Sequence, residues 1–183
     1  MKKVFIVHGF EGSPNGGWRP WLMGELEKHD IYACALSMPS PENPRLSEWT
    51  EEIKRHVDRN AKDDIYLVGH SLGVPAILHF IEKDSSGKVI GVVLVSGPFH
   101  GGRNDKLIEF LQPFVFSVIR SKLKKIIVIH GDNDEMVPIS DAKILVDKLN
   151  ARLIVIKNGG HLNGGSGWFK LPECLGSLLD IMG

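Results

Sequence analysis

Six short runs of mostly apolar residues recur along the chain, and they constrain its fold more than any other feature. They occupy residues 3–9, 31–37, 64–70, 89–97, 125–132 and 152–157. Within each run the apolar residues are continuous rather than alternating with polar ones. That pattern is typical of strands buried on both faces of a parallel sheet. The runs therefore predict a mainly parallel, six-stranded sheet.

The segments between these runs have the composition and periodicity of helices. Segment 45–60 carries one apolar stripe, and segment 74–84 is apolar almost all round. Further helices are expected at 18–29, 140–150 and 171–182. Strands that alternate with helices predict an α/β fold with helices on both sides of the sheet. In such sheets ligands bind in the loops that follow the strands.

Length and charge narrow the possible classes of function. The 183 residues predict a single domain, 1–183, and 43% hydrophobic residues are enough for a buried core. Lys and Arg together number 22, as do Asp and Glu, and this balance argues against a nucleic-acid or anionic-membrane partner. No run approaches the length of a membrane span, and the first apolar run is too short for a signal peptide. The expectation is a soluble, cytoplasmic protein.

Two cysteines, Cys34 and Cys174, provide neither a disulfide framework nor a zinc pattern. The loop after the first run is rich in glycine but lacks the Lys-Ser/Thr of a phosphate loop and the G-x-G-x-x-G of a dinucleotide site. We therefore expect no metal and no cofactor.

The stretch GHSLG after the third run fits the G-x-S-x-G pattern of a nucleophile elbow. In that turn the serine, here Ser71, adopts a strained backbone conformation that lifts its hydroxyl above the sheet. Gly69 and Gly73 flank it because side chains at those positions would collide. The neighbouring His70 is expected to point away from Ser71. An apolar strand before the motif and an apolar helix after it are the context that an elbow requires.

A serine hydroxyl needs a histidine as base, and the histidine needs a carboxylate to orient it. His161 follows the last run in a glycine-rich loop, and Asp134 follows the fifth run. The order Ser71, Asp134, His161 is that expected for an α/β hydrolase. Asp132 competes with Asp134 for the role of the acid, and Glu135 is a more remote alternative.

The negative oxygen of a tetrahedral intermediate needs two N–H donors. We expect one from Leu72, directly after the serine, and one from Phe10, in the loop after the first run. Pro75 supports the first assignment. Its missing N–H is harmless only in the first turn of a helix, so the helix should begin no earlier than about Leu72, which leaves the Leu72 N–H free.

With these residues placed, the chain resembles the α/β-hydrolase superfamily, and within it the small serine hydrolases of the YdeN and retinoblastoma-binding-protein-nine type. The likeness covers nearly the whole chain. It rests on HGFEGSPNGGWRPWL, MPSPENPRLSEW, GHSLGVPAIL, VVLVSG, D-x-x-V-P and GGH. The resemblance implies a compact hydrolase fold without the first antiparallel strands of larger relatives. It also implies that Ser71, Asp134 and His161 are the catalytic residues.

Larger hydrolases often carry a cap domain after the strand that corresponds to VVLVSG. Here residues 98–125 leave room for only one or two short helices, so no large cap is expected. The site should be open. The aromatic and apolar residues expected to line its pocket are Phe10, Trp18, Phe99, Phe114, Val137 and Leu162.

The sequence therefore predicts a serine hydrolase that forms an acyl-enzyme, most simply a carboxylesterase for small or medium acyl esters. An amide substrate is a less favoured variant. Two alternatives stay open: an acyltransferase that uses the same serine, and a protein-binding member of the fold with little or no catalysis. The expected partner is a small-molecule ester, and the sequence does not identify whether a protein partner exists.

Overall fold

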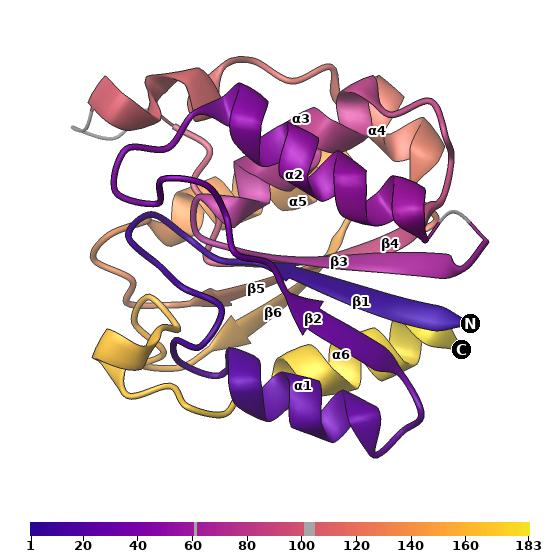
Figure 1. Ribbon diagram of the computed structural model, residues 1–183. Coiled ribbons are helices and arrows are strands. Elements are labelled where there is room, and N and C mark those ends of the chain that lie inside the picture. Colours follow the sequence, from indigo (N-terminus) through magenta and orange to yellow (C-terminus); the bar gives the residue numbers. More distant parts are fainter. Residues whose placement is uncertain (61, 101–104) are drawn as a thin grey trace.

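Six parallel strands form one sheet through the centre of the molecule in the computed structural model, which describes residues 1–60, 62–100 and 105–183 (Figure 1). The strands are β1 (Lys2–Val7), β2 (Tyr32–Ala35), β3 (Asp64–His70), β4 (Val89–Val95), β5 (Lys125–Gly131) and β6 (Arg152–Ile156). Their order across the sheet is β2-β1-β3-β4-β5-β6, and every adjacent pair is parallel. Each apolar run thus forms a strand, as predicted.

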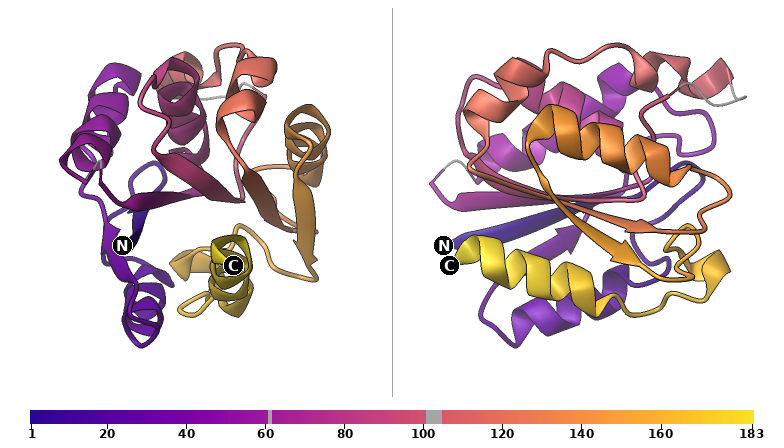
Figure 2. Two further views of the ribbon diagram at one scale, coloured as in Figure 1. Left: turned by 90° about the vertical axis from the view of Figure 1, so that its right-hand side faces the viewer. Right: turned by 180° about the vertical axis from the view of Figure 1, so that it is seen from behind.

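Helices cover both faces of this sheet. They are α1 (Arg19–Glu27), α2 (Leu46–Arg59), α3 (Gly73–Lys83), α4 (Phe116–Lys122), α5 (Ile139–Leu149) and α6 (Pro172–Met182), with 3-10 turns η1 (Asp105–Leu111) and η2 (Gly164–Ser166). Helices α2 to α5 lie on one face, and α1 and α6 lie on the other (Figures 1 and 2). The result is a three-layer α/β arrangement.

Two hydrophobic clusters, one on each face, hold the layers together. The α2 stripe buries Trp49, Ile53 and Val57 against one face, whereas α1 buries Leu22 and Leu26 against the other. Full burial of such a side chain stabilises the fold by about 1.5–3 kcal/mol. Helix α3 is buried from Gly73 to Ile81, which explains why its sequence is apolar almost all round.

Helix α3 begins at Gly73, with Leu72 as its N-cap residue. Pro75 is therefore the third residue of the helix, inside the first turn, where its missing N–H costs no helical hydrogen bond. The predicted start of this helix is confirmed.

Between β4 and β5 the described residues form only η1 and α4, so the fold carries no large cap, as expected. Among the described residues, no helix is both long enough and apolar enough to cross a membrane.

Candidate active site

The loops after β1, β3, β5 and β6 meet at one edge of the sheet, because the carboxyl ends of parallel strands lie together (left in Figure 1). A cavity of about 400 Å³ opens among three of these loops, and the fourth, after β5, contributes Met136. Ser71 and His161 both line it. The structure thus brings the proposed nucleophile and base to the same place from positions 90 residues apart (161 − 71).

Ser71 occupies a sharp turn between β3 and α3. Its φ of 52° lies in the left-handed region, which costs a residue with a side chain about 1–3 kcal/mol. A Cβ at Gly69 would lie 2.9 Å from the Val74 nitrogen, and a Cβ at Gly73 would overlap the Val7 carbonyl oxygen. Only glycine fits at these two positions, so the predicted elbow geometry is present.

The Ser71 backbone is fixed by its own N–H, which donates to the Val95 oxygen at 2.9 Å. Gly9 in the loop after β1 approaches so closely that a Cβ there would lie 2.8 Å from Ser71 Cβ. Within the described residues the Ser71 hydroxyl makes no hydrogen bond, and the residue lines the cavity. The hydroxyl is therefore available to a ligand.

The carboxylate beside His161 is Asp134. His161 Nδ1 donates to Asp134 Oδ2 at 2.8 Å, and the side chains of both residues are buried. The other oxygen, Oδ1, accepts the N–H groups of Met136 and Val137, each at 2.9 Å. These bonds fix the carboxylate and aim one oxygen at the imidazole.

These contacts also set the charge of Asp134. Burial by itself raises the pKa of this carboxyl, but the hydrogen bonds from His161, Val137 and Met136 outweigh it and hold the pKa below its usual value. Asp134 is therefore ionised at neutral pH, as an orienting carboxylate must be.

The two competing carboxylates, Asp132 and Glu135, make no hydrogen bond to His161 within the described residues. Asp132 Oδ1 accepts the Asn158 N–H at 2.7 Å and thereby ties the loops after β5 and β6 together. Glu135 is exposed. Of the three candidate acids, only Asp134 is hydrogen-bonded to His161.

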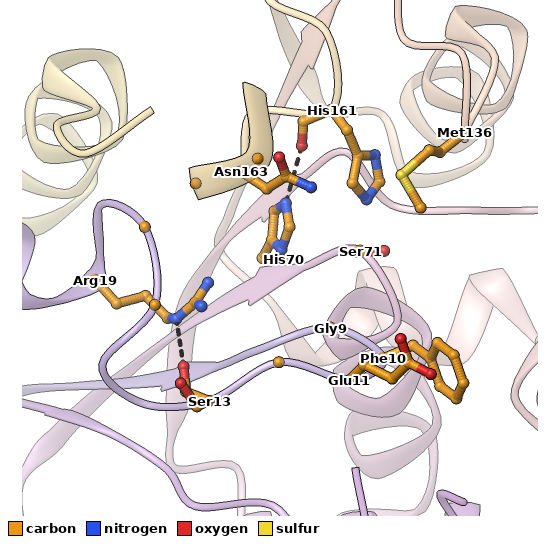
Figure 3. A pocket seen from close by; sticks show the side chains of 15 residues that line it. Gly9, Phe10, Glu11, Ser13, Arg19, His70, Ser71, Met136, His161 and Asn163 are labelled. Atoms are coloured by element: carbon orange, nitrogen blue, oxygen red, sulfur yellow. Dashed lines mark hydrogen bonds between the residues drawn. The ribbon is translucent and has the colours of Figure 1, made fainter. Parts of the chain in front are cut away.

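His70 lies beneath the His161 loop, away from the Ser71 hydroxyl (Figure 3). Its Nε2 is 3.0 Å from the His161 carbonyl oxygen, to which it donates, and the two rings lie 5.1 Å apart between centroids. Burial, with the nearby imidazole of His161 adding to it, lowers the pKa of His70 to about 3. His70 is therefore neutral in the folded protein and supports the backbone that carries His161.

This buried histidine predicts acid sensitivity. The unfolded chain gains a proton at His70 near pH 6.5, whereas the folded chain does so only near pH 3. Between these values the unfolded state binds more protons, so the free energy of unfolding falls with falling pH, by up to about 1.4 kcal/mol per unit. His70→Gln, whose amide can still donate, should have a shallower dependence in urea unfolding between about pH 7 and 5. An unchanged slope would contradict the buried neutral state.

The two backbone N–H groups expected to stabilise the oxyanion remain without a hydrogen-bond acceptor in the described part of the chain. Within the described residues, neither the Phe10 N–H nor the Leu72 N–H donates to another group. Leu72 precedes the first helical residue, and Phe10 follows β1 in the loop that lines the cavity. Both expected donors thus lie unpaired beside the serine.

A second cavity of about 550 Å³ adjoins the first. Both cavities share Phe10, Glu11, Ser71, Met136 and His161. Beyond these shared residues, the first cavity is lined by glycines and by polar or charged side chains. The second cavity is mostly apolar, and its own apolar side chains are Leu72, Pro98, Leu107, Leu111, Val137 and Pro138. Ser71 and His161 therefore lie at the junction of an apolar cavity and a polar cavity.

Of the residues expected in the pocket, Phe10 and Val137 line these cavities, as does Leu72. Four others line neither of them and lie in or against the core instead: Trp18, Phe99, Phe114 and Leu162. Trp18 is fully buried and its indole N–H donates to the Leu162 oxygen at 2.8 Å, so this pair joins two loops from within. Phe99 and Phe114 each pack against the ring of Phe116.

Among the cavity-lining residues that sequence reasoning missed are Arg19, Met136 and Asn163. The only hint in the sequence that Arg19 lies in the site is its position as the single charged residue of the otherwise apolar stretch WRPWL. A charged residue near the start of an amphipathic helix is ordinarily assigned to its solvated face, and this one is buried.

The topology and the elbow together define the fold of an α/β hydrolase. The chain belongs to the Serine hydrolase family, whose sequence model matches residues 4–180.

Two curated relatives and two solved structures illustrate this membership. YdeN of Bacillus subtilis is 35% identical in sequence over 93% of this chain and 91% of its own. The crystal structure of YdeN superposes on this chain with a TM-score of 0.90 at 33% identity, and the match covers 100% of this chain and 99% of that chain. Serine hydrolase RBBP9 of Rattus norvegicus is 28% identical over 87% of this chain and 86% of its own. Est1E of Butyrivibrio proteoclasticus shares the fold, with a TM-score of 0.78 at 17% identity over 99% of this chain and 88% of that chain.

Proposed function

We propose that the protein is a carboxylesterase that works through a covalent acyl-enzyme on Ser71. The observation that carries the proposal is the His161 Nδ1 to Asp134 Oδ2 hydrogen bond of 2.8 Å, beside a serine held at φ 52° in the same cavity as His161. A bound carboxylate fixes the tautomer of the imidazole, so that Nε2 is free to accept a proton from a hydroxyl.

In the proposed first half-reaction, Ser71 Oγ attacks the ester carbonyl carbon as His161 Nε2 takes the hydroxyl proton. The carbonyl oxygen becomes an anion and accepts hydrogen bonds from the N–H groups of Phe10 and Leu72. The C–O bond to the leaving alcohol then breaks, and His161 returns the proton to that alcohol. Asp134 stays ionised and stabilises the imidazolium meanwhile.

In the second half-reaction, water takes the place of the alcohol. His161 removes a proton from the water, and the resulting oxygen attacks the acyl carbon. Collapse of this second tetrahedral intermediate releases the carboxylic acid, and His161 returns the proton to Ser71 Oγ. The neutral His70 beneath His161 keeps a second positive charge away from the imidazolium.

An acyl-enzyme has a kinetic signature. With an activated 4-nitrophenyl ester, the proposal predicts a burst of about one nitrophenolate per active site before steady turnover. Addition of a primary alcohol tests the acyltransferase alternative, because a transferase would divert most of the acyl group to the alcohol. Turnover with no burst and no dependence on Ser71 would refute the mechanism. Absence of turnover on esters and anilides alike would favour the binding-only alternative.

The apolar cavity predicts a limit on acyl length. Each methylene that enters it contributes about 0.8 kcal/mol, so kcat/KM should rise about three- to fourfold per methylene until the cavity is filled. We expect the rise to stop at about six to eight carbons, because no large cap extends the apolar surface. Comparable kcat/KM for 4-nitrophenyl acetate, hexanoate and palmitate would contradict small or medium acyl specificity.

A further inference from the structure

Arg19 is a buried arginine in the polar cavity, and the proposed chemistry does not use it. The residue is 6% exposed, and it lines the same cavity as Ser71 and His161. Within the described residues its guanidinium forms no ion pair; its one hydrogen bond runs from Nε to the Ser13 carbonyl oxygen at 2.9 Å. Buried arginines are ordinarily paired with a carboxylate, because an uncompensated charge away from water is costly.

The guanidinium is held in one orientation. The Nε bond to Ser13 fixes one edge of the plane, and the Trp18 ring lies 5.8 Å from the guanidinium carbon. Gly16 makes this placement possible, since a Cβ at that position would overlap Nη2. In Figure 3 the terminal nitrogens project into the cavity toward His70. The two terminal NH2 groups of this positively charged, preorganised fork are therefore left for a ligand.

The same charge acts on its titratable neighbours. Arg19 contributes to lowering the pKa of His70 and of His8, after burial as the main cause in each case. The carboxylate of Glu11 also lines the cavity, but its side chain lies beside Phe10, at the end away from Arg19 (Figure 3). The positive end of the cavity thus lacks an internal counter-charge within the described residues.

A second donor faces the same cavity. Asn163 Oδ1 accepts the Ser166 N–H at 2.8 Å, and this bond fixes which end of the amide is oxygen. The amide nitrogen is left without a partner in the described residues and points into the cavity (Figure 3). The remaining lining is largely glycine, namely Gly9, Gly12, Gly16, Gly17, Gly164 and Gly165, which leaves space between these donors.

We propose that Arg19, assisted by Asn163, binds a carboxylate group of the substrate, so that the preferred substrate is an ester carrying one free carboxylate. The apolar cavity on the other side of Ser71 takes the apolar part of the same molecule. Arg19 is thus a specificity-determining residue. The inference rests on the proposed esterase function, because it assigns the substrate class to that same site. A fork-shaped guanidinium matches the two oxygens of a carboxylate.

The test uses two matched pairs of esters, since the carboxylate can belong to the acyl group or to the leaving group. The first pair is mono-4-nitrophenyl glutarate and its methyl ester. The second is 4-butyryloxybenzoate and its methyl ester. In each pair methylation removes the charge and retains the scissile bond. The readout is the ratio of kcat/KM for the anionic ester to that for the neutral ester, in which any loss common to both substrates cancels.

For at least one pair, Arg19→Gln should lower this ratio by about 10- to 100-fold, which is the loss expected when a hydrogen bond to a charged group is removed. Arg19→Lys, which retains the charge without the fork, should lower it less. Gly16→Ala displaces the guanidinium and should lower the ratio although Arg19 is present. The control is Arg59→Gln, which removes one exposed positive charge at the end of α2 and should leave the ratio as it is. A ratio independent of Arg19 in both pairs would overturn the inference.

A purely structural Arg19, which only anchors the loop through Ser13, gives a different result. Its variants would lower kcat/KM for anionic and neutral esters equally, and the ratio would stay constant. Failure of the esterase proposal is also distinguishable, because neither member of a pair would then be hydrolysed in a manner that depends on Ser71. Ser71-dependent hydrolysis with an Arg19-independent ratio therefore refutes this inference alone.

Discussion

Ser71→Ala is expected to lower kcat/KM for an activated ester by about 10⁴- to 10⁶-fold, the largest effect of any single substitution in this site. The hydroxyl is the only group of the protein that bonds to substrate carbon in the proposed mechanism. Without it, no acyl-enzyme forms, and the N–H groups of Phe10 and Leu72 are left to accelerate direct attack by water only weakly. The loss should appear in kcat rather than in KM, since the cavities that bind the substrate are unchanged.

Ser96 provides a matched control for this substitution. It follows the neighbouring strand β4, has a φ of 48°, and carries a fully buried hydroxyl with no hydrogen-bond partner within the described residues. Ser96→Ala therefore alters a serine in the same backbone conformation without touching either cavity, and activity within about threefold of wild type is expected, since the buried hydroxyl has no bond to lose. If Ser71→Ala retained wild-type hydrolysis, the assignment of the nucleophile would be wrong.

The second largest effect is expected for Asp134→Asn, about 10⁴-fold in kcat. The asparagine amide can donate an N–H to His161 Nδ1 and thereby stabilise the opposite tautomer, in which Nε2 carries a proton and cannot accept one from Ser71. The variant also loses the negative charge that stabilises the imidazolium. Steady-state kinetics on the activated ester measure the loss, and thermal unfolding tests whether the variant is folded.

Asp132→Asn is the matched control, because it makes the same chemical change two residues away. Asp132 binds the Asn158 N–H, and an asparagine oxygen can accept that bond equally well. We expect a loss of less than about tenfold. Equal losses of kcat for the two variants would mean that both carboxylates act by maintaining loop structure. The assignment of Asp134 as the acid of the triad would then be contradicted.

The fold was predictable from the sequence because a parallel sheet buries both faces of its strands. A continuous apolar run as short as 64–70, bounded by polar residues and glycine, is typical of such a strand. Pro75 likewise located the start of α3, because the constraint it imposes is local. The elbow was equally accessible, since Gly69 and Gly73 meet backbone atoms that any elbow would place there.

The pocket was much less predictable. Trp18 and Phe99 follow strands at the correct edge of the sheet, as pocket residues do, yet they point into or against the core. An aromatic residue in a loop has the same local signature in either role, and long-range packing decides between them. Arg19 was overlooked for the converse reason: its burial depends on Gly16 and on the Ser13 carbonyl, contacts that exist only in the folded loop.

Whether Ser71 is an activated nucleophile can be measured with a fluorophosphonate probe, followed by intact-protein and peptide mass spectrometry. One adduct per wild-type chain is expected, located on Ser71, and no adduct on Ser71→Ala. Asp134→Asn should label far more slowly than Asp132→Asn. An adduct on another residue, or equal labelling of wild type and Ser71→Ala, would contradict the assignment of Ser71 as the nucleophile.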